Sequence, residues 1–447
     1  MRLLRENLYK KVNDIAVNIH KLDDYLIHGH VLAVQGLLIT VSTKYANLSL
    51  GTTCNIETKY ETIVGEVVGF TENKAFVMPN GIMEGISPGN KVSFFTLPSI
   101  IYPDDSWLGR ILDANANPID DKGLLMRGSE PSYLKSTPIN SSKRMKVIDK
   151  MSVGVRSINT FLTCCKGQRL GVFAGSGVGK STLMSMLAKY SECDVCVIGL
   201  IGERGREVRE FIDGTLGEDG LKKSVMVVAT SDESPLMRRG AAYTTMAIAE
   251  SFRSRGKNVL LLMDSITRFA MAQREIGLSA GEPPTTKGYP PSVFSELPKL
   301  LERAGPGTEK DGGYMSAFFN VLVDGDDHNE PISDTVRGIL DGHIVMERSI
   351  AETGQYPAIN VLKSISRCVP QCHDEQQQDI LKKAKKLISS YENMSDMINL
   401  GAYRAGTNPE VDEAIEKHPK MIEFLSQKSN ENDSIDESFY KLSQIIN

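Results

Sequence analysis

RLGVFAGSGVGKST, residues 169–182, joins an apolar run with strand character to a glycine-rich turn, and the helix-forming run of residues 183–189 follows at once. Strand, glycine-rich turn and helix in this order are the context that a phosphate-binding P-loop requires. A strict P-loop begins with glycine, where this chain has Ala174, but that position opens the loop and need not touch phosphate. A chance glycine-rich loop would rarely combine all three features, so the sequence predicts a nucleotide phosphate site.

The chemistry of this site follows from its residue types. Glycines let backbone N–H groups turn inward to form an anion-binding nest, and the next helix presents its positive N-terminal end to the phosphates. Lys180 is expected to reach the β- and γ-phosphates, and the Ser181 hydroxyl to bind Mg²⁺. The residues expected to bind nucleotide in this loop are Gly175, Ser176, Gly177, Val178, Gly179, Lys180, Ser181 and Thr182.

Two carboxylates follow apolar strand-like runs further along the chain. Asp264 directly follows residues 259–263, and a carboxylate at the end of a core strand can hold Mg²⁺ directly or through water. It could instead cap the helix that starts after it. Glu203 follows residues 195–201 and could act as the general base that polarises the attacking water. Alone, that second assignment is weak, because surface loops are rich in glutamate and arginine.

The surroundings of the P-loop alternate between strand-like and helical runs. Residues 195–201, 225–229 and 259–263 are fully apolar, as in strands buried on both faces, and residues 241–254 are helical in pattern. The fold predicted for residues 151–373 is an α/β P-loop core with a mostly parallel sheet.

Three other parts surround this core. Short β-rich runs with turn punctuation predict a small β-barrel at residues 23–96, and residues 97–150 are rich in proline, aspartate and serine, which predicts a connector. Lys/Glu/Leu-rich patterning with breaks at Gly401 and Pro409 predicts a C-terminal helical domain at residues 374–447.

The first residues carry a separate pattern. Apolar residues recur at helical spacing and predict an amphipathic N-terminal helix over residues 1–22. Its apolar stripe consists of Leu4, Leu8, Val12, Ile15 and Ile19. This helix could pack on its own domain or dock a partner, and the sequence favours neither.

Composition excludes several classes of protein. The chain has 447 residues, enough for two to four domains, and a net charge of −5, which argues against a nucleic-acid-binding protein. No apolar run approaches the roughly 20 residues that span a bilayer, and the N-terminus lacks a signal-peptide core, so a cytoplasmic location is expected. The seven cysteines are scattered and are expected to be buried reduced thiols rather than a metal or redox site.

Longer motifs resemble a known family. These are AGSGVGKST, GLIGERGREV, LLLMDSITRFAMAQREIG, AGEPPTTKGYPPSVFSELPKLLERAG, DGHIV and YPAINVLKSISR. They are similar to the type III secretion ATPases, relatives of the rotary ATPase catalytic subunit, and the likeness runs from the barrel to the C-terminal helices. Within that family, MAQREIGLSAGEPPTTKGYPPSVF and LGAYRAGTNPEVDEAI most resemble the flagellar export branch.

The resemblance implies a RecA/F1-like core and assigns further roles. Glu203 matches the catalytic glutamate of the family, and Arg204 beside it is expected to share the catalytic site. Tyr356 matches the aromatic residue that packs on adenine, and Arg367 matches the arginine that reaches the γ-phosphate held by a neighbouring subunit. Without the resemblance, Tyr356 would be interpreted as a core residue and Arg367 as a surface cation.

The same resemblance implies an Mg²⁺-dependent ATP hydrolase that energises or primes protein export through a flagellar-type type III apparatus. Its active sites would be shared between the subunits of a homohexamer. Expected partners are a regulatory stalk protein at the N-terminal helix, a central coiled-coil stalk, export substrates with chaperones, and the membrane export gate, with no nucleic acid. The expected location is cytoplasmic, peripherally associated with the inner-membrane export apparatus.

Three alternatives remain open. The chain could serve a virulence-type secretion apparatus, or be a non-catalytic nucleotide-binding subunit of a rotary ATPase, although such subunits lack a carboxylate at the position of Glu203. A hexameric RNA translocase shares the core fold, but the mild acidity of this chain counts against it.

Overall fold

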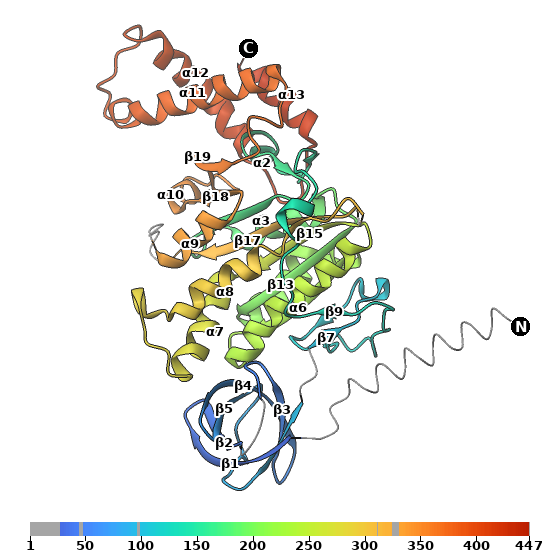
Figure 1. The fold of residues 1–447 in the computed structure, drawn as a ribbon. Helices are drawn as coiled ribbons and strands as arrows, with labels where there is room; N and C mark the ends of the chain where they lie inside the picture. The colour runs from blue at the N-terminus through green and yellow to red at the C-terminus, as the bar shows by residue number, and fades with distance from the viewer. Residues whose placement is uncertain (1–26, 44–47, 96–98, 311, 324–329, 447) are drawn as a thin grey trace, which may run out of the picture. The chain divides into compact units, whose positions relative to one another are not determined.

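The structure is a computed structural model that describes residues 27–43, 48–95, 99–310, 312–323 and 330–446 (Figure 1). The predicted N-terminal helix, with its apolar stripe, lies outside the described residues. The chain forms two compact units. One holds the N-terminal part to Pro98 together with Ile276–Glu282, and the other holds Ser99–Glu275 and Pro283–Asn447.

The first unit contains a closed antiparallel barrel with the strand order β1-β2-β5-β4-β3-β6. The strands are β1 (Ile27–Gln35), β2 (Leu38–Ser42), β3 (Thr53–Glu57), β4 (Thr62–Thr71), β5 (Lys74–Pro79) and β6 (Lys91–Phe95). Alternate apolar side chains, such as Ile39, Ile56 and Val77, fill the interior and are inaccessible to solvent. The predicted barrel is confirmed. The sequence did not indicate β3, because polar residues alternate with its two buried ones.

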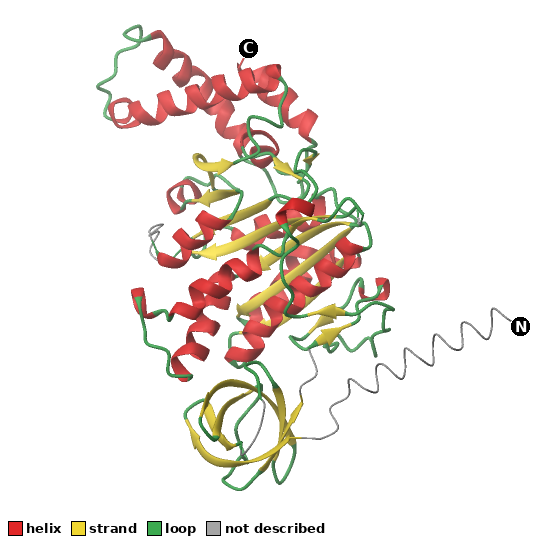
Figure 2. Ribbon diagram, viewed as in Figure 1, coloured by secondary structure: helices red, strands yellow, loops and turns green. Residues whose placement is uncertain are grey.

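The second unit is built on a nine-stranded sheet with the order β19-β18-β12-β17-β15-β13-β14-β8, with β16 paired to β17 (Figure 2). All neighbours are parallel except the β16–β17 and β18–β19 pairs. The strands are β8 (Ile111–Leu112), β12 (Arg169–Ala174), β13 (Val195–Glu203), β14 (Ser224–Thr230), β15 (Asn258–Asp264), β16 (Gly305–Pro306), β17 (Tyr314–Leu322), β18 (Gly342–Met346) and β19 (Ile359–Ser366). The predicted α/β P-loop fold is therefore confirmed.

Helices cover both faces of this sheet and create two apolar cores. One core contains α6 and α8, and the other contains α3 and parts of the C-terminal helices. The helices of this part are α2 (Arg156–Phe161), α3 (Lys180–Tyr190), α4 (Gly205–Arg209), the π-helical η3 (Glu210–Leu216), α5 (Gly217–Lys222), α6 (Pro235–Ser254), α7 (Ile266–Ser279), α8 (Pro291–Leu301), α9 (Pro331–Ile339) and α10 (Arg348–Glu352). The end of α7, from Ile276, belongs to the first unit. Short 3-10 turns lie at η1 (Asp105–Trp107), η2 (Ser141–Lys143) and η4 (Thr286–Gly288).

Residues 99–150, expected to be a connector, are packed on this unit. They contribute β8 to the edge of the sheet and both strands of the short pair β7–β9, and they end where β10 pairs with β11. The pairs comprise β7 (Ile100–Ile101), β9 (Ser132–Tyr133), β10 (Lys150–Met151) and β11 (Cys164–Cys165). Arg303, 1% exposed, donates to the carbonyl oxygens of Tyr133 and Leu134 and pairs with Glu250 at 2.6 Å. Two-residue strands have no periodicity, so the sequence could not indicate this packing.

Three helices follow the sheet: α11 (Glu375–Asn399), α12 (Pro409–Leu425) and α13 (Ile435–Ile446). Asp374 and Asn408 cap the first two by accepting hydrogen bonds from backbone N–H groups. The predicted C-terminal helical region is confirmed. Met421, Phe424 and Leu442 bury their side chains in the same core as α3, so these helices share a core with the helix that follows the P-loop.

All seven cysteines are free thiols, as expected, but only four are buried, because Cys193, Cys368 and Cys372 are partly exposed. Within the part of the chain that the structure describes, no helix is both long and apolar enough to cross a membrane.

Candidate nucleotide-binding and catalytic site

The predicted P-loop lies between the end of β12 and the start of α3. Gly177 and Gly179 have φ angles of +81° and +88°, in the left-handed region that other residues rarely adopt. No acidic side chain lies in the first turn of α3, so the positive end of that helix remains available to an anion. The local backbone therefore has the left-handed glycines and the uncompensated helix start that a phosphate nest requires.

Lys180 opens α3 and meets both predicted carboxylates. Its Nζ lies 2.6 Å from Asp264 Oδ1 and 3.7 Å from Glu203 Oε1. The two acids end neighbouring parallel strands, since Leu200 of β13 pairs with Asp264 of β15. Carboxyl ends of parallel strands meet at one edge of a sheet, where open α/β folds bind their ligands. The structure thus brings three of the predicted catalytic and metal-binding residues together.

Burial and charge set the protonation of this cluster. Burial raises the pKa of Glu203, and the charge of Asp264 adds to it, so that the pKa reaches about 7 although Lys180 opposes the shift. Burial alone would lower the pKa of Lys180, but the charges of Asp264 and Glu203 outweigh it and raise that pKa. Lys180 therefore stays charged, while Glu203 can exchange a proton near neutral pH, as a general base requires.

A pH profile would test this assignment. We expect kcat/KM for ATP to rise as pH increases through about 7, because only ionised Glu203 can accept a proton from water. The neighbouring Glu207 raises the pKa of Glu203 through a hydrogen bond and its charge. Glu207→Gln should therefore move the midpoint of the profile to lower pH. A flat profile between about pH 5.5 and 8.5, or an unmoved midpoint, would contradict this role for Glu203.

Ser181 and Asp264 offer oxygen donors that suit Mg²⁺. Ser181 is exposed beside Lys180 at the start of α3, and the Asp264 carboxylate lies against the same lysine. Hydroxyl and carboxylate oxygens, completed by phosphates and water, are the ligands that Mg²⁺ prefers. Among the described residues, no group of three or more His, Cys, Asp or Glu side chains could hold a metal ion, so phosphates and water would have to complete the ligand set. The residues present fit a nucleotide-bound Mg²⁺.

A large cavity of about 1630 Å³ opens beside the P-loop. Gly179, Thr182, Tyr356 and Phe424 are among its lining residues. Tyr356 packs on the P-loop, because a Cβ atom on Gly179 would lie 3.2 Å from its ring. The Tyr356 side chain is 45% exposed, so it offers a flat face to the cavity rather than joining the core.

Phe424 is a cavity residue that the sequence did not indicate. It lies in the last turn of α12, and Met421 three residues before it is also buried. This spacing is typical of a helix that packs on a core, and Phe424 does belong to the core. No local signal in the sequence therefore marks Phe424 as part of the cavity lining.

The two predicted arginines both have exposed side chains. The Arg204 side chain is 74% exposed and pairs with Glu207 at 3.5 Å. Arg367 is exposed just beyond β19, and its backbone N donates to Asp341 O at 2.9 Å.

Arg367 and the P-loop of its own chain lie at opposite ends of the parallel strands. Ser366, just before it, pairs with Gly342 at the start of β18, and β18 runs parallel to β12. Arg367 therefore lies at the end of the sheet where β12 begins, whereas the P-loop follows the other end of β12. At about 3.3 Å per residue, the length of β12 places them roughly 15–20 Å apart. Arg367 cannot contact a phosphate held by its own P-loop.

Three protein-family models match the chain. The nucleotide-binding domain of the ATP synthase alpha/beta family matches residues 154–366, and the beta-barrel domain of the same family matches residues 31–95. The C-terminal domain of the type III secretion ATPase EscN matches residues 373–444.

Known proteins match over nearly the whole length. A flagellum-specific ATP synthase of Caulobacter vibrioides is 55% identical over 96% of this chain and 98% of its own. A protein of the same name from Bacillus subtilis is 51% identical over 96% of this chain and 97% of its own.

Solved structures agree with this likeness. The assembled ATPase EscN of the enteropathogenic E. coli type III secretion system has a TM-score of 0.86 and 38% identity, and covers 94% of this chain and 100% of that one. EscN in complex with its central stalk EscO matches with a TM-score of 0.85, the same identity and the same coverage.

Proposed function

The chain belongs to the ATP synthase alpha/beta family and to its type III export branch, and we propose that it hydrolyses ATP with Mg²⁺ to energise or prime export through a flagellar-type apparatus. The observation that supports this chemistry best is the meeting of Lys180, Glu203 and Asp264 behind the P-loop. A non-catalytic subunit could use Asp264 to hold Mg²⁺, but it would have no use for the second carboxylate, Glu203, beside the P-loop lysine.

The residues of the chain divide the work. Backbone N–H groups of residues 175–182 and the Lys180 ammonium bind the phosphates, and Lys180 exchanges its contact with Asp264 for them. Ser181 and Asp264 hold Mg²⁺, which neutralises phosphate charge when bound. Glu203 takes the proton of the attacking water. The exposed ring of Tyr356 receives the base in the cavity, and the buried Phe424 supports the cavity wall.

We further infer that active sites are shared between subunits. Arg367 lies too far from its own P-loop but is exposed at the opposite edge of the sheet, where a neighbouring copy could bring its own P-loop. EscN is described as an assembled ATPase, which supports self-association of its relatives. A homohexamer is the proposed assembly. Arg204, exposed beside Glu203, is proposed to act at the same interface.

Partners follow from the same relationship. EscN binds a central stalk, EscO, so a coiled-coil stalk is proposed as a partner of this chain. A regulatory stalk protein at residues 1–22, export substrates with chaperones, and the membrane export gate complete the proposed set. The proposed location is the cytoplasm, against the inner-membrane export apparatus.

A complementation experiment tests export. Expression of this chain in Caulobacter vibrioides that lacks its own flagellum-specific ATP synthase should restore flagellar filaments, measured by microscopy and swimming, because the two chains are 55% identical. The Lys180→Ala variant should not restore them, because it loses the phosphate contact. Exposed Lys222 pairs only at the surface with Asp219, so Lys222→Ala should restore filaments and serves as the matched control. An active ATPase that leaves the cells without filaments would contradict the flagellar assignment.

A further inference from the structure

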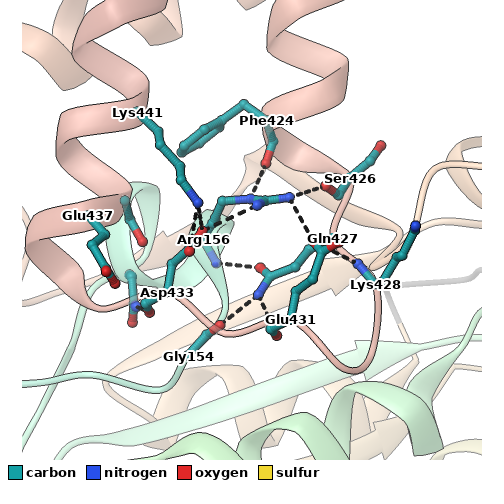
Figure 3. A network of polar contacts seen from close by, with 12 residues as sticks. Gly154, Arg156, Phe424, Ser426, Gln427, Lys428, Glu431, Asp433, Glu437 and Lys441 are labelled. Carbon is teal, nitrogen blue, oxygen red and sulfur yellow. Dashed lines mark hydrogen bonds and ion pairs between the residues drawn. The ribbon is translucent and has the colours of Figure 1, made fainter.

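A polar network joins the start of α2 to the segment between α12 and α13 (Figure 3). Its centre is Arg156, whose side chain is 12% exposed. The guanidinium donates through Nε to Phe424 O at 2.9 Å and through a terminal nitrogen to Ser426 O. It also pairs with Asp433 at 3.2 Å and with Glu431 at 3.6 Å.

Gln427 is the second centre of this network and is 5% exposed. Its Oε1 accepts from the backbone N of Arg156 at 2.8 Å, and its Nε2 donates to Gly154 O at 2.8 Å and Glu431 O at 2.9 Å. Its backbone N donates to Tyr356 O at 2.7 Å. One buried residue therefore links the start of α2, the Tyr356 loop and the end of α12.

The residue types suit these contacts. Helix α12 ends at Leu425, and the last carbonyl groups of a helix have no partner within it. A guanidinium near a helix C-terminus is favourable both as a donor and as a positive charge. Its planar set of five donors can serve two carbonyls and a carboxylate at once, which the ammonium of lysine cannot do in the same geometry. Asp433 is also bound by Lys441 at 2.7 Å, so it is not left unpaired if Arg156 is replaced.

This network touches the two aromatic residues that line the cavity beside the P-loop. Arg156 binds the backbone of Phe424, and Gln427 binds the backbone of Tyr356. All four residues line that cavity together with Gly179. The backbone of Phe424 and the backbone of Tyr356 are therefore tied together by contacts made outside the P-loop.

We propose that Arg156 and Gln427 are positioning residues for the base of the bound nucleotide. They hold the backbone of Tyr356 against the end of α12, so that the exposed Tyr356 ring can accept a flat base, while the phosphates are held elsewhere. The inference rests on the proposed function, because it requires the base of ATP to occupy this cavity. It makes the affinity for ATP, but not the affinity for bare phosphate chains, depend on how the C-terminal helices join the core.

The test compares two ligands. Arg156→Lys keeps the charge and most of the volume but loses the forked donor set. It should raise the Kd of ATP about ten-fold, which corresponds to about 1.4 kcal/mol, a fraction of what base stacking on aromatic side chains contributes. The Kd of inorganic tripolyphosphate, which lacks base and ribose, should change less than about two-fold. Gln427→Met, similar in volume but without polar atoms, should produce the same difference.

A matched control is available at a neighbouring junction. Lys417 binds Glu413 at 2.8 Å and Ile446 O at 2.6 Å, which ties α12 to α13 outside the cavity lining. Lys417→Ala should leave both dissociation constants unchanged. Equal weakening of both ligands by Arg156→Lys and Gln427→Met would indicate a general structural role and overturn the proposal, as would unchanged ATP binding.

A double substitution sharpens the result. When Tyr356→Leu has already removed the exposed ring, Arg156→Lys should weaken ATP binding by much less than ten-fold. The effects of two substitutions do not add when one residue acts through the other. A full ten-fold loss in that background would contradict the proposal. If the wild-type chain binds ATP no more tightly than tripolyphosphate, the proposed base site itself fails. If it prefers ATP and Arg156→Lys keeps that preference, only the positioning role fails.

Discussion

Glu203→Gln should lower the rate of ATP hydrolysis by roughly two to four orders of magnitude, the usual contribution of a general base, while ATP binding persists. Glutamine keeps the shape of the side chain but cannot accept the proton of water. Above about pH 7 the substitution also removes a negative charge that lies 3.7 Å from Lys180, so the affinity for ATP should hold or increase. Single-turnover hydrolysis and equilibrium binding, measured on the same preparation, separate the two effects.

The matched control is an exposed glutamate on α5. Glu218→Gln makes the same chemical change at a side chain that is exposed to solvent, and it should leave the rate unaltered. Near wild-type hydrolysis by the Glu203→Gln chain would show that another group accepts the proton. Loss of ATP binding together with hydrolysis would instead indicate that Glu203 supports the fold of the P-loop.

Arg367→Ala should lower hydrolysis by about 10³–10⁵-fold, the usual contribution of an arginine that reaches a transferring phosphoryl group. Because Arg367 lies at the other end of the strands from its own P-loop, the proposed shared site has a neighbouring copy receive it. Mixing Glu203→Gln chains with Arg367→Ala chains should therefore restore part of the activity, since some interfaces then combine an intact Glu203 with an intact Arg367. The specific activity of the wild-type chain should also rise steeply with protein concentration.

Lys363→Ala is the control for this experiment. Lys363 lies on the same strand, β19, and its exposed side chain pairs with Glu347 at 2.7 Å. Lys363→Ala should leave the rate of hydrolysis nearly unchanged, because a surface ion pair usually contributes little to stability. No recovery on mixing, together with activity per chain that stays constant on dilution to monomers, would contradict the shared site.

The core of the fold could be predicted because its central strands are buried on both faces and are therefore continuous apolar runs. Strands β12, β13, β14 and β15 have this character. The positions of Lys180 and Asp264 could be predicted because β12 ends just before the P-loop and β15 ends at Asp264. The strand β8 has two residues, and no periodicity can mark an element of that length.

The cavity could not be predicted from local patterns. Tyr356 and Phe424 come from segments far apart in the sequence, and each looks like an ordinary core aromatic in its own surroundings. The resemblance to a family supplied the proposed roles of Tyr356 and Arg367, and only the topology places Arg367 out of reach of its own P-loop. Arg156 and Gln427 carried no signal, because their contacts join residues more than two hundred positions apart.

The order of strands in the sheet also governs how a newly made chain can acquire its fold. Strand β12 lies between β17 and β18, where Gly171 pairs with Phe319 and with His343. A ribosome adds about 5–20 residues per second, so roughly ten to thirty seconds separate the synthesis of β12 from that of both its neighbours. During this interval an apolar strand has two open edges, which invite wrong pairing. The barrel, whose strands all lie within residues 27–95, can close long before. Strand β12, which leads into the P-loop, therefore cannot pair with its native neighbours until β17 and β18 have been made. During synthesis it stays unpaired for longer than any strand of the barrel.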